Sequence, residues 1–134
     1  MIENMVLKFL KADTELNTLT GGKIYPDTAQ VSDLPCVIMT ADAPTSPIDE
    51  PYYYTQNLTF EIYAASEASA QSIRNRLYAL LNKYDDFKLN DAQNGLMIRE
   101  AHAVSASVSN HFPNDTKQAK EKVASFDFQY TKCA

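Results

Sequence analysis

The sequence predicts an α+β fold in which two amphipathic helices pack on one face of a four-stranded antiparallel or mixed sheet, in the order α-β-β-α-β-β. Two segments carry apolar residues at three- and four-residue spacing, which is typical of helices with one buried face. Other segments are continuously apolar or alternate, which is typical of strands. Because each helix must bury its apolar face, a layer of helices against the sheet is expected. The length of 134 residues suits a single domain over residues 1–134.

The first helix is predicted from one apolar stripe near the start of the chain. Lys8 and Lys11 near its end suit the negative pole of the helix dipole. A further turn over Thr14–Leu19 ends at Gly21 and Gly22, and residues 23–33 are expected to form a loop with some extended character. The stripe has the i, i+3, i+4, i+7, i+8 spacing of a buried helix face and consists of Ile2, Met5, Val6, Phe9 and Leu10.

A hairpin with a long tip is predicted next. Leu34 to Thr40 is a short apolar run that indicates a buried strand. Tyr52–Tyr63 alternates between apolar and polar residues, which indicates a strand with one buried face. Between them, Asp42–Pro51 is rich in proline and acidic residues and is expected to be a surface loop.

The second helix and two closing strands complete the predicted fold. Ser66 and Glu67 provide a helix cap and a first-turn acid. Leu96–Ser109 and Lys120–Thr131 read as strands, joined by a turn within Asn110–Gln118. The apolar face of the helix consists of Ala70, Ile73, Leu77, Leu80, Leu81 and Tyr84.

Charge and composition argue against several classes of protein. The chain carries 12 basic and 17 acidic residues, a net charge of −5, so it lacks the basic surface of a dedicated nucleic-acid reader. Its apolar runs are too short for a spanning helix, and charged residues interrupt the N-terminal stripe, so neither a membrane segment nor a signal peptide is expected. Without a secretion signal, Cys36 and Cys133 are expected to be free thiols.

Catalytic and metal-binding patterns are weak, so we expect no enzyme, no cofactor and no metal. Cys36 with His102 is the one conceivable thiol–imidazole pair, although a buried thiol beside an unrelated histidine explains both residues more simply. His102 shares the parity of the apolar residues in its strand. The remaining alternative is a metal-dependent nuclease using strand carboxylates at Glu61, Glu100 and Asp127. Glu61 and Asp127 have the solvent-facing parity of their strands, whereas Glu100 shares the parity of Leu96 and Ile98 and is expected at an edge or paired.

Tyrosines form the most informative cluster. Tyr52, Tyr53 and Tyr54 stand in a row where the proline-rich loop enters a strand. Because successive strand residues point to opposite faces, at least one of these rings must point away from the core. The row reads either as ordinary strand aromatics that cover a loop or as a contact patch, since exposed tyrosine is enriched in interfaces.

The order of elements and several short motifs resemble the tail-terminator or tail-completion family of long-tailed phages, which includes tail-to-head joining proteins. The resemblance rests on the first helix followed by Ile24-Tyr25-Pro26, and on Leu34-Pro35-Cys36-Val37-Ile38-Met39. A variable loop, the strand TQNLTFEIYAAS and the helix ASAQSIRNRLYALL follow, and the last two strands fit the closing pair of the family.

This resemblance implies a structural virion protein at the head–tail interface, assembled in the host cytoplasm. It implies a ring, expected to be a hexamer, that caps the head-proximal end of the tail tube and joins it to the head connector. The implied partners are other copies of the chain, the tail tube protein and the head completion or connector protein. DNA would pass through the lumen without specific binding, which suits an acidic chain.

The resemblance also directs attention to two loops as assembly surfaces. We expect the loop Asp42–Pro51 with the tyrosine row to contact a neighbouring ring or to line the lumen, with Asn110–Gln118 as a second candidate. A generic homo-oligomeric interaction module that uses the same sheet edges is the alternative from outside the phage class. The candidate interface residues are Asp42, Pro44, Pro47, Asp49, Glu50, Tyr52, Tyr53, Tyr54, His111, Phe112, Asn114 and Asp115.

Overall fold

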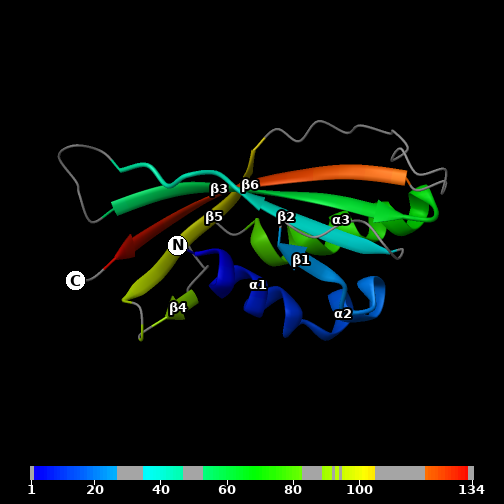
Figure 1. Ribbon diagram of the computed structural model, residues 1–134, viewed down its shortest axis with the longest axis horizontal. Helices are drawn as coiled ribbons and strands as arrows, with labels where there is room; N and C mark the ends of the chain where they lie inside the picture. The colour runs from blue at the N-terminus through cyan, green and yellow to red at the C-terminus, as the bar shows by residue number, and fades with distance from the viewer. Residues whose placement is uncertain are drawn as a thin grey trace.

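The computed structural model describes residues 2–26, 35–46, 53–82, 89–91, 93, 95–104 and 120–132. A curled six-stranded mixed sheet forms one layer, with strand order β1-β2-β3-β6-β5-β4. The helices α1, α2 and α3 lie together on one side of it (Figure 1). No helix in this described part of the chain is both long and apolar enough to cross a bilayer.

The predicted fold class is wrong in the number of strands and helices. The structure has the order α-α-β-β-β-α-β-β-β, so the four-stranded sheet with two helices becomes a six-stranded sheet with three. The added strands β1 (Ile24–Pro26) and β4 (Leu89–Asp91) have three residues each, and the added helix α2 (Thr14–Thr20) has seven. The two strands hold too few residues for a period to stand out in the sequence. The helix α2 forms where a further turn over Thr14–Leu19 was expected, and it ends at Gly21 as predicted.

Side-chain caps fix the start of α2 and α3, whereas α1 begins after Ile2 without one. In α1 (Glu3–Lys11), Met5, Val6 and Leu10 are buried. The Asp13 carboxylate accepts a hydrogen bond from the Leu16 amide at 2.8 Å and so caps α2, which ends at Gly21 with φ of 65°. Ser66 caps α3 (Glu67–Leu81) in the same way, as predicted, while Tyr84 lies outside the described residues.

Both predicted hairpins are confirmed as antiparallel pairs. β2 (Cys36–Ala41) pairs with β3 (Tyr53–Ala64), and the pairing continues past β2 through a bridge between Thr45 and Thr55. β3 also pairs along its whole length with β6 (Lys120–Lys132), which places the two longest strands at the centre of the sheet. The outer strands are β1, parallel to β2, and β4, antiparallel to β5 (Leu96–Val104).

A β-bulge in β5 overturns the predicted orientation of His102. Ile98 pairs with Tyr130 but Glu100 pairs with Gln129, so the register shifts between them. The extra residue reverses the alternation, because two residues oppose one at a bulge. His102 therefore pairs with Asp127 and lies on the face away from the core, although its parity predicted the opposite. Glu100 moves to that same face.

The core lies between the helices and the facing side of the sheet. From β6, Ala124, Phe126, Phe128 and Tyr130 are buried there, as their alternation predicts. Phe126 packs edge-on against Phe60 and Tyr78 with ring centroids 5.9 and 5.2 Å apart. The opposite side, called here the open face, is mostly half-buried and polar. An apolar cluster on that side consists of Cys36, Ile38 and Tyr63, with Tyr25 packed against it.

Candidate functional site

The β2–β3 hairpin carries the described part of the predicted interface. Asp42 is exposed and Pro44 half-buried beyond the end of β2, and Tyr53 and Tyr54 are half-buried at the start of β3. The remaining candidates lie outside the described residues, so their role stays a prediction: Pro47, Asp49, Glu50, Tyr52, His111, Phe112, Asn114 and Asp115.

Tyr53 and Tyr54 point to opposite faces of the sheet, as the alternation predicts. The Tyr53 hydroxyl donates a hydrogen bond to Gln129 Oε1 on the open face. Tyr54 stacks on Tyr130 on the helix side, with ring centroids 5.4 Å apart and planes inclined by 17°. Both rings are therefore held against β6. Tyr53 and Tyr54, called here the hairpin base, are half-buried, so part of each side chain is accessible.

A buried polar cluster ties this base to α1. Gln56 is 1% exposed, and its Nε2 donates to Glu3 Oε1 at 2.6 Å and to the Asp42 carbonyl at 2.8 Å. The Tyr130 hydroxyl donates to Gln56 Oε1 at 3.3 Å. Burial first, then the Glu3 carboxylate and Tyr54, raise the pKa of Tyr130 to about 12. The side-chain amide of Gln56, on β3, thus connects α1, β6 and the residue that follows β2.

The pKa of Glu3 is lowered from its ordinary value. Burial acts in the opposite direction, but hydrogen bonds to the carboxylate outweigh it, first from the N-terminal ammonium group, then from the Glu3 amide and from Gln56. Glu3 is therefore ionised at neutral pH and strengthens its bond to Gln56 through its charge. Sequence reasoning missed this cluster, because Gln56 reads as an ordinary polar residue in an alternating strand.

A groove lies between α1 and the edge strand β4, with a volume of about 510 Å³. The sequence indicates only a polar link around β4, so this groove was also missed. Its apolar lining comes from Met5, Phe9 and Leu89. Its polar and small lining residues are Asn4, Lys8, Ala12, Asn90, Asp91 and Gln93. We call this feature the α1–β4 groove.

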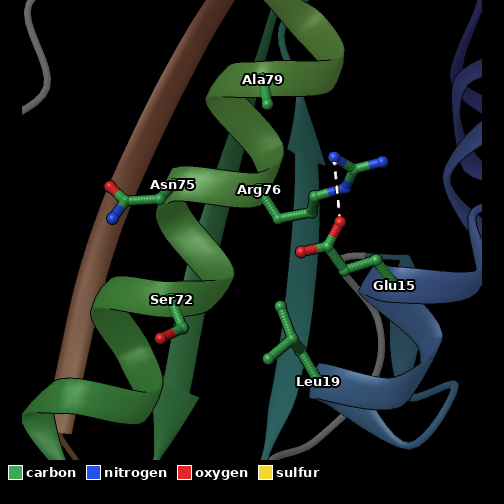
Figure 2. A pocket seen from close by; sticks show the side chains of 6 residues that line it. All are labelled: Glu15, Leu19, Ser72, Asn75, Arg76 and Ala79. Carbon is green, nitrogen blue, oxygen red and sulfur yellow. Dashed lines mark ion pairs between the residues drawn. The ribbon is translucent and has the colours of Figure 1, made fainter.

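A second hollow, of about 360 Å³, lies between α2 and α3 (Figure 2). Arg76 reaches from α3 toward α2, where its guanidinium contacts Asp13 at 2.7 Å and Glu15 at 3.1 Å. The hydrogen bond from Arg76 is the main cause that holds the pKa of Asp13 below its ordinary value. Because two carboxylates neutralise Arg76, this arrangement joins two helices and offers little positive charge to a ligand.

The open face brings some of the predicted chemical residues together and separates others. His102 lies 3.9 Å from Glu100 and 4.0 Å from Asp127, between nitrogen and carboxylate oxygen atoms. Asp127 pairs with Asn57 on β3, and Glu61 lies four residues further along that strand. Glu61 is therefore about 13 Å from the position of Asp127, at about 3.3 Å per residue. Within the described residues, no group of three or more histidine, cysteine or acidic side chains could hold a metal ion.

The Cys36–His102 pair does not form. Through the sheet register, Cys36 aligns with Tyr63 and so with Glu121, whereas His102 aligns with Asp127. Glu121 and Asp127 are about 20 Å apart along β6 at roughly 3.3 Å per residue. A thiol and an imidazole at this separation cannot exchange a proton directly.

Uncharged and acidic side chains join β3 to β6 on the open face. Asn57 Nδ2 donates to Ser125 Oγ and to Asp127 Oδ1, both at 2.9 Å. Thr59 lies 3.2 Å from Ser125 between hydroxyl oxygens. This side of the central strands is thus a connected polar surface, positioned by strand register.

Comparisons with known proteins bear on the fold. No protein-family model matches the sequence, and no curated protein matches it. Among solved structures, the chain is similar to a chain of a structure described as the virion of a native gene transfer agent (GTA) particle, with a TM-score of 0.71 and 17% sequence identity. The match covers 94% of this chain and 91% of that one. The two chains therefore share one fold over nearly their whole lengths.

Proposed function

We propose that this chain is a structural virion protein that forms a ring at the head-proximal end of a phage tail tube. The ring stops the growth of the tube and joins it to the head connector. The ring is expected to contain six copies of the chain in all, and its other partners are the tail tube protein and the head completion or connector protein. It acts through shape and surface complementarity, without catalysis.

The fold shared with a virion chain carries this proposal. The match spans 94% of this chain at a TM-score of 0.71, so it involves the whole arrangement of helices and sheet. The motifs Ile24-Tyr25-Pro26 and Leu34-Pro35-Cys36-Val37-Ile38-Met39 add the resemblance to tail-completion proteins. Fold alone is compatible with many functions, and the two lines together favour an assembly role.

The arrangement of the sheet supports assembly into a ring. A closed ring needs two different surfaces on each subunit, one meeting the other around the axis. β1 and β4 are different edges of one sheet, and each is a short strand that is paired on one side within the sheet. The base of the β2–β3 hairpin adds the partly accessible rings of Tyr53 and Tyr54.

Electrostatics support the passage of DNA without binding. The net charge is −5, and on the open face the charged side chains described for β3 and β6 are Glu61 and Asp127. A surface of this sign repels phosphates, and hydroxyl and amide groups cover much of the rest. Such a surface can border a channel for DNA without retaining it.

Electron microscopy of particles made with and without this protein tests the proposal. Without the protein we expect overlong tubes or heads without tails. Tails of normal length joined to heads would contradict it. The position of the gene separates this function from a generic oligomeric module, because a joining protein is expected among portal, connector and tail-tube genes. Replacing Glu61, Glu100 and Asp127 by alanine is expected to preserve joining, whereas a nuclease would lose its activity.

A further inference from the structure

We propose that the α1–β4 groove binds the hairpin tip, residues 47–52, of a second copy of this chain. The inference rests on the self-assembly proposed above and identifies the surfaces that meet. The groove belongs to one subunit, and the segment that fills it comes from the next.

The chemistry of the groove suits a short peptide segment. Met5, Phe9 and Leu89 form an apolar part that water would otherwise cover, while Asn4, Asn90 and Gln93 provide hydrogen-bonding groups around it. An apolar base with a few polar groups at its margin is typical of sites that bind a side chain and its backbone. The neighbouring strand β4 is the last strand of the sheet, and an added segment can lie beside it.

The margin of the groove is basic on its helix side, and on its strand side it carries one acidic residue, Asp91. Lys8 lines the groove, and Lys11 follows one helical turn later on α1; both side chains are exposed. Among the described residues, the ion pairs and side-chain hydrogen bonds leave both ammonium groups unengaged. Two neighbouring cations that support no internal contact are available to an acidic partner.

The hairpin is the complementary part of the same sequence. Between Lys23 and Arg74 the sequence contains no lysine or arginine, whereas Asp42, Asp49 and Glu50 all fall within the nine residues from 42 to 50. The chain thus separates its charges between the first helix and the hairpin. This complementarity favours a second copy of the chain as the occupant of the groove.

The tip also contains apolar side chains that match the base of the groove. Ile48 stands next to Asp49 and Glu50, and Tyr52 follows Pro51. In the proposed contact, Ile48 packs against Met5, Phe9 and Leu89 while the two acids approach Lys8 and Lys11. Apolar burial contributes most of the affinity, and the charges select the partner and its orientation.

The hairpin base and the α1–β4 groove are two separate surfaces of one molecule. Tyr53 aligns with Thr131, then Met97 and finally Asn90, so the hairpin base and β4 are separated by three strand spacings, or about 14 Å. Figure 1 shows β4 and the N-terminal end of β3 toward the same end of the molecule. A contact between these different surfaces is heterologous and can propagate from copy to copy until a ring closes.

A charge-exchange experiment tests the contact. One variant carries Lys8→Glu and Lys11→Glu, and the other carries Asp49→Lys and Glu50→Lys. By sedimentation velocity we expect the wild type to self-associate. Each variant alone is expected to self-associate with an affinity lower by a factor of about ten. An equimolar mixture is expected to recover association, because each groove then meets a tip of opposite charge. Lys23→Glu is the matched control for Lys8→Glu, because Lys23 precedes β1, away from the groove, and should leave association unchanged.

The possible failures are distinguishable. If both variants associate like the wild type, or if the mixture does not recover, the proposed contact is wrong while ring formation stands. If the wild type does not self-associate, or if the tip fills the groove of its own chain, the contact between copies is wrong. The tail phenotype described above tests the proposed function independently of these results.

A peptide measurement covers the case in which a variant does not fold. A synthetic peptide of residues 42–54 is titrated into the isotope-labelled wild-type protein. We expect NMR shifts at Met5, Phe9 and Leu89, and much weaker shifts with a peptide carrying Asp49→Lys and Glu50→Lys. Equal shifts with both peptides, or shifts elsewhere on the protein, would overturn the proposal.

Discussion

Replacing Gln56 by leucine tests whether the buried polar cluster anchors the hairpin to the first helix. Leucine fills a similar volume but leaves the Tyr130 hydroxyl without its acceptor and removes one of the donors to the Glu3 carboxylate. Glu3 is half-buried and Asp42 exposed, so water can replace the amide at both. Tyr130 is fully buried, so the loss is concentrated on its hydroxyl.

The magnitude follows from this difference in access to water. Leaving the buried Tyr130 hydroxyl without a hydrogen bond costs about 1–3 kcal/mol. The hydrogen bond from Gln56 to the charged Glu3 contributes about 1.5–3 kcal/mol, and water that replaces Gln56 at Glu3 restores part of this. Leucine offsets some of this through apolar burial, so we expect Gln56→Leu to lower the free energy of unfolding by about 2–3 kcal/mol. Tyr130→Phe keeps the stacking on Tyr54 and should cost about 1 kcal/mol or less.

A double-mutant cycle provides the decisive comparison. Because phenylalanine has no hydroxyl to satisfy, the double variant should be about 1 kcal/mol more stable than Gln56→Leu alone. The chain contains no tryptophan, so urea unfolding is followed by far-ultraviolet circular dichroism, with the slope m compared between variants. If the two losses simply add, the cluster does not work as a unit and this reasoning is refuted.

Three further outcomes are expected. Phe126→Ala should lower the free energy of unfolding in urea by about 3–5 kcal/mol, and Phe126→Leu by clearly less, because alanine leaves a cavity between Phe60 and Tyr78; equal losses would contradict this. Glu3→Gln should destabilise the protein at neutral pH. The folded-state pKa of Glu3 is lowered, so its contribution is present above the ordinary value of 4.5 and is lost as the pH falls through the folded value. The difference between wild type and variant should therefore shrink in acid, and a pH-independent difference would exclude this origin. Deleting residues 43–50 should preserve the circular dichroism spectrum, since the pairing lost among the described residues 43–46 is one isolated bridge, yet abolish head–tail joining in a complementation assay; normal joining would remove the hairpin tip from the interface.

Long, regular elements were predictable because their residues repeat one local environment many times. α3 and the central strands β3 and β6 span 15, 12 and 13 residues, enough for the helical and alternating periods to emerge. Ser66 could be identified as a cap because its hydroxyl accepts a hydrogen bond from the amide of Ser69, only three residues later in the sequence. The opposite orientations of Tyr53 and Tyr54 likewise follow from adjacency in a strand.

The orientation of His102 was not predictable, because one inserted residue decides it. Odd and even residues stay on opposite faces along a strand only if each residue pairs in turn with the neighbouring strand. The bulge between Ile98 and Glu100 shifts the pairing by one residue and so exchanges the two faces. The bulge is defined by the register of β5 on β6, which is a property of the paired strands. The Glu100–His102–Asp127 cluster therefore became visible only in the folded chain.

By itself, the sequence determined the main helices and strands, the two hairpins and the acidic character of the chain, because these depend on neighbours a few positions apart and on composition. The tertiary structure alone decided the two edge strands, the joining of Gln56 to Glu3 and the groove where α1 meets β4. These features join residues from distant parts of the chain, and no local period encodes such distances. The groove and the sheet edges on which the proposed assembly rests are of this second kind, whereas the acidic hairpin segment that would fill the groove is read from the sequence.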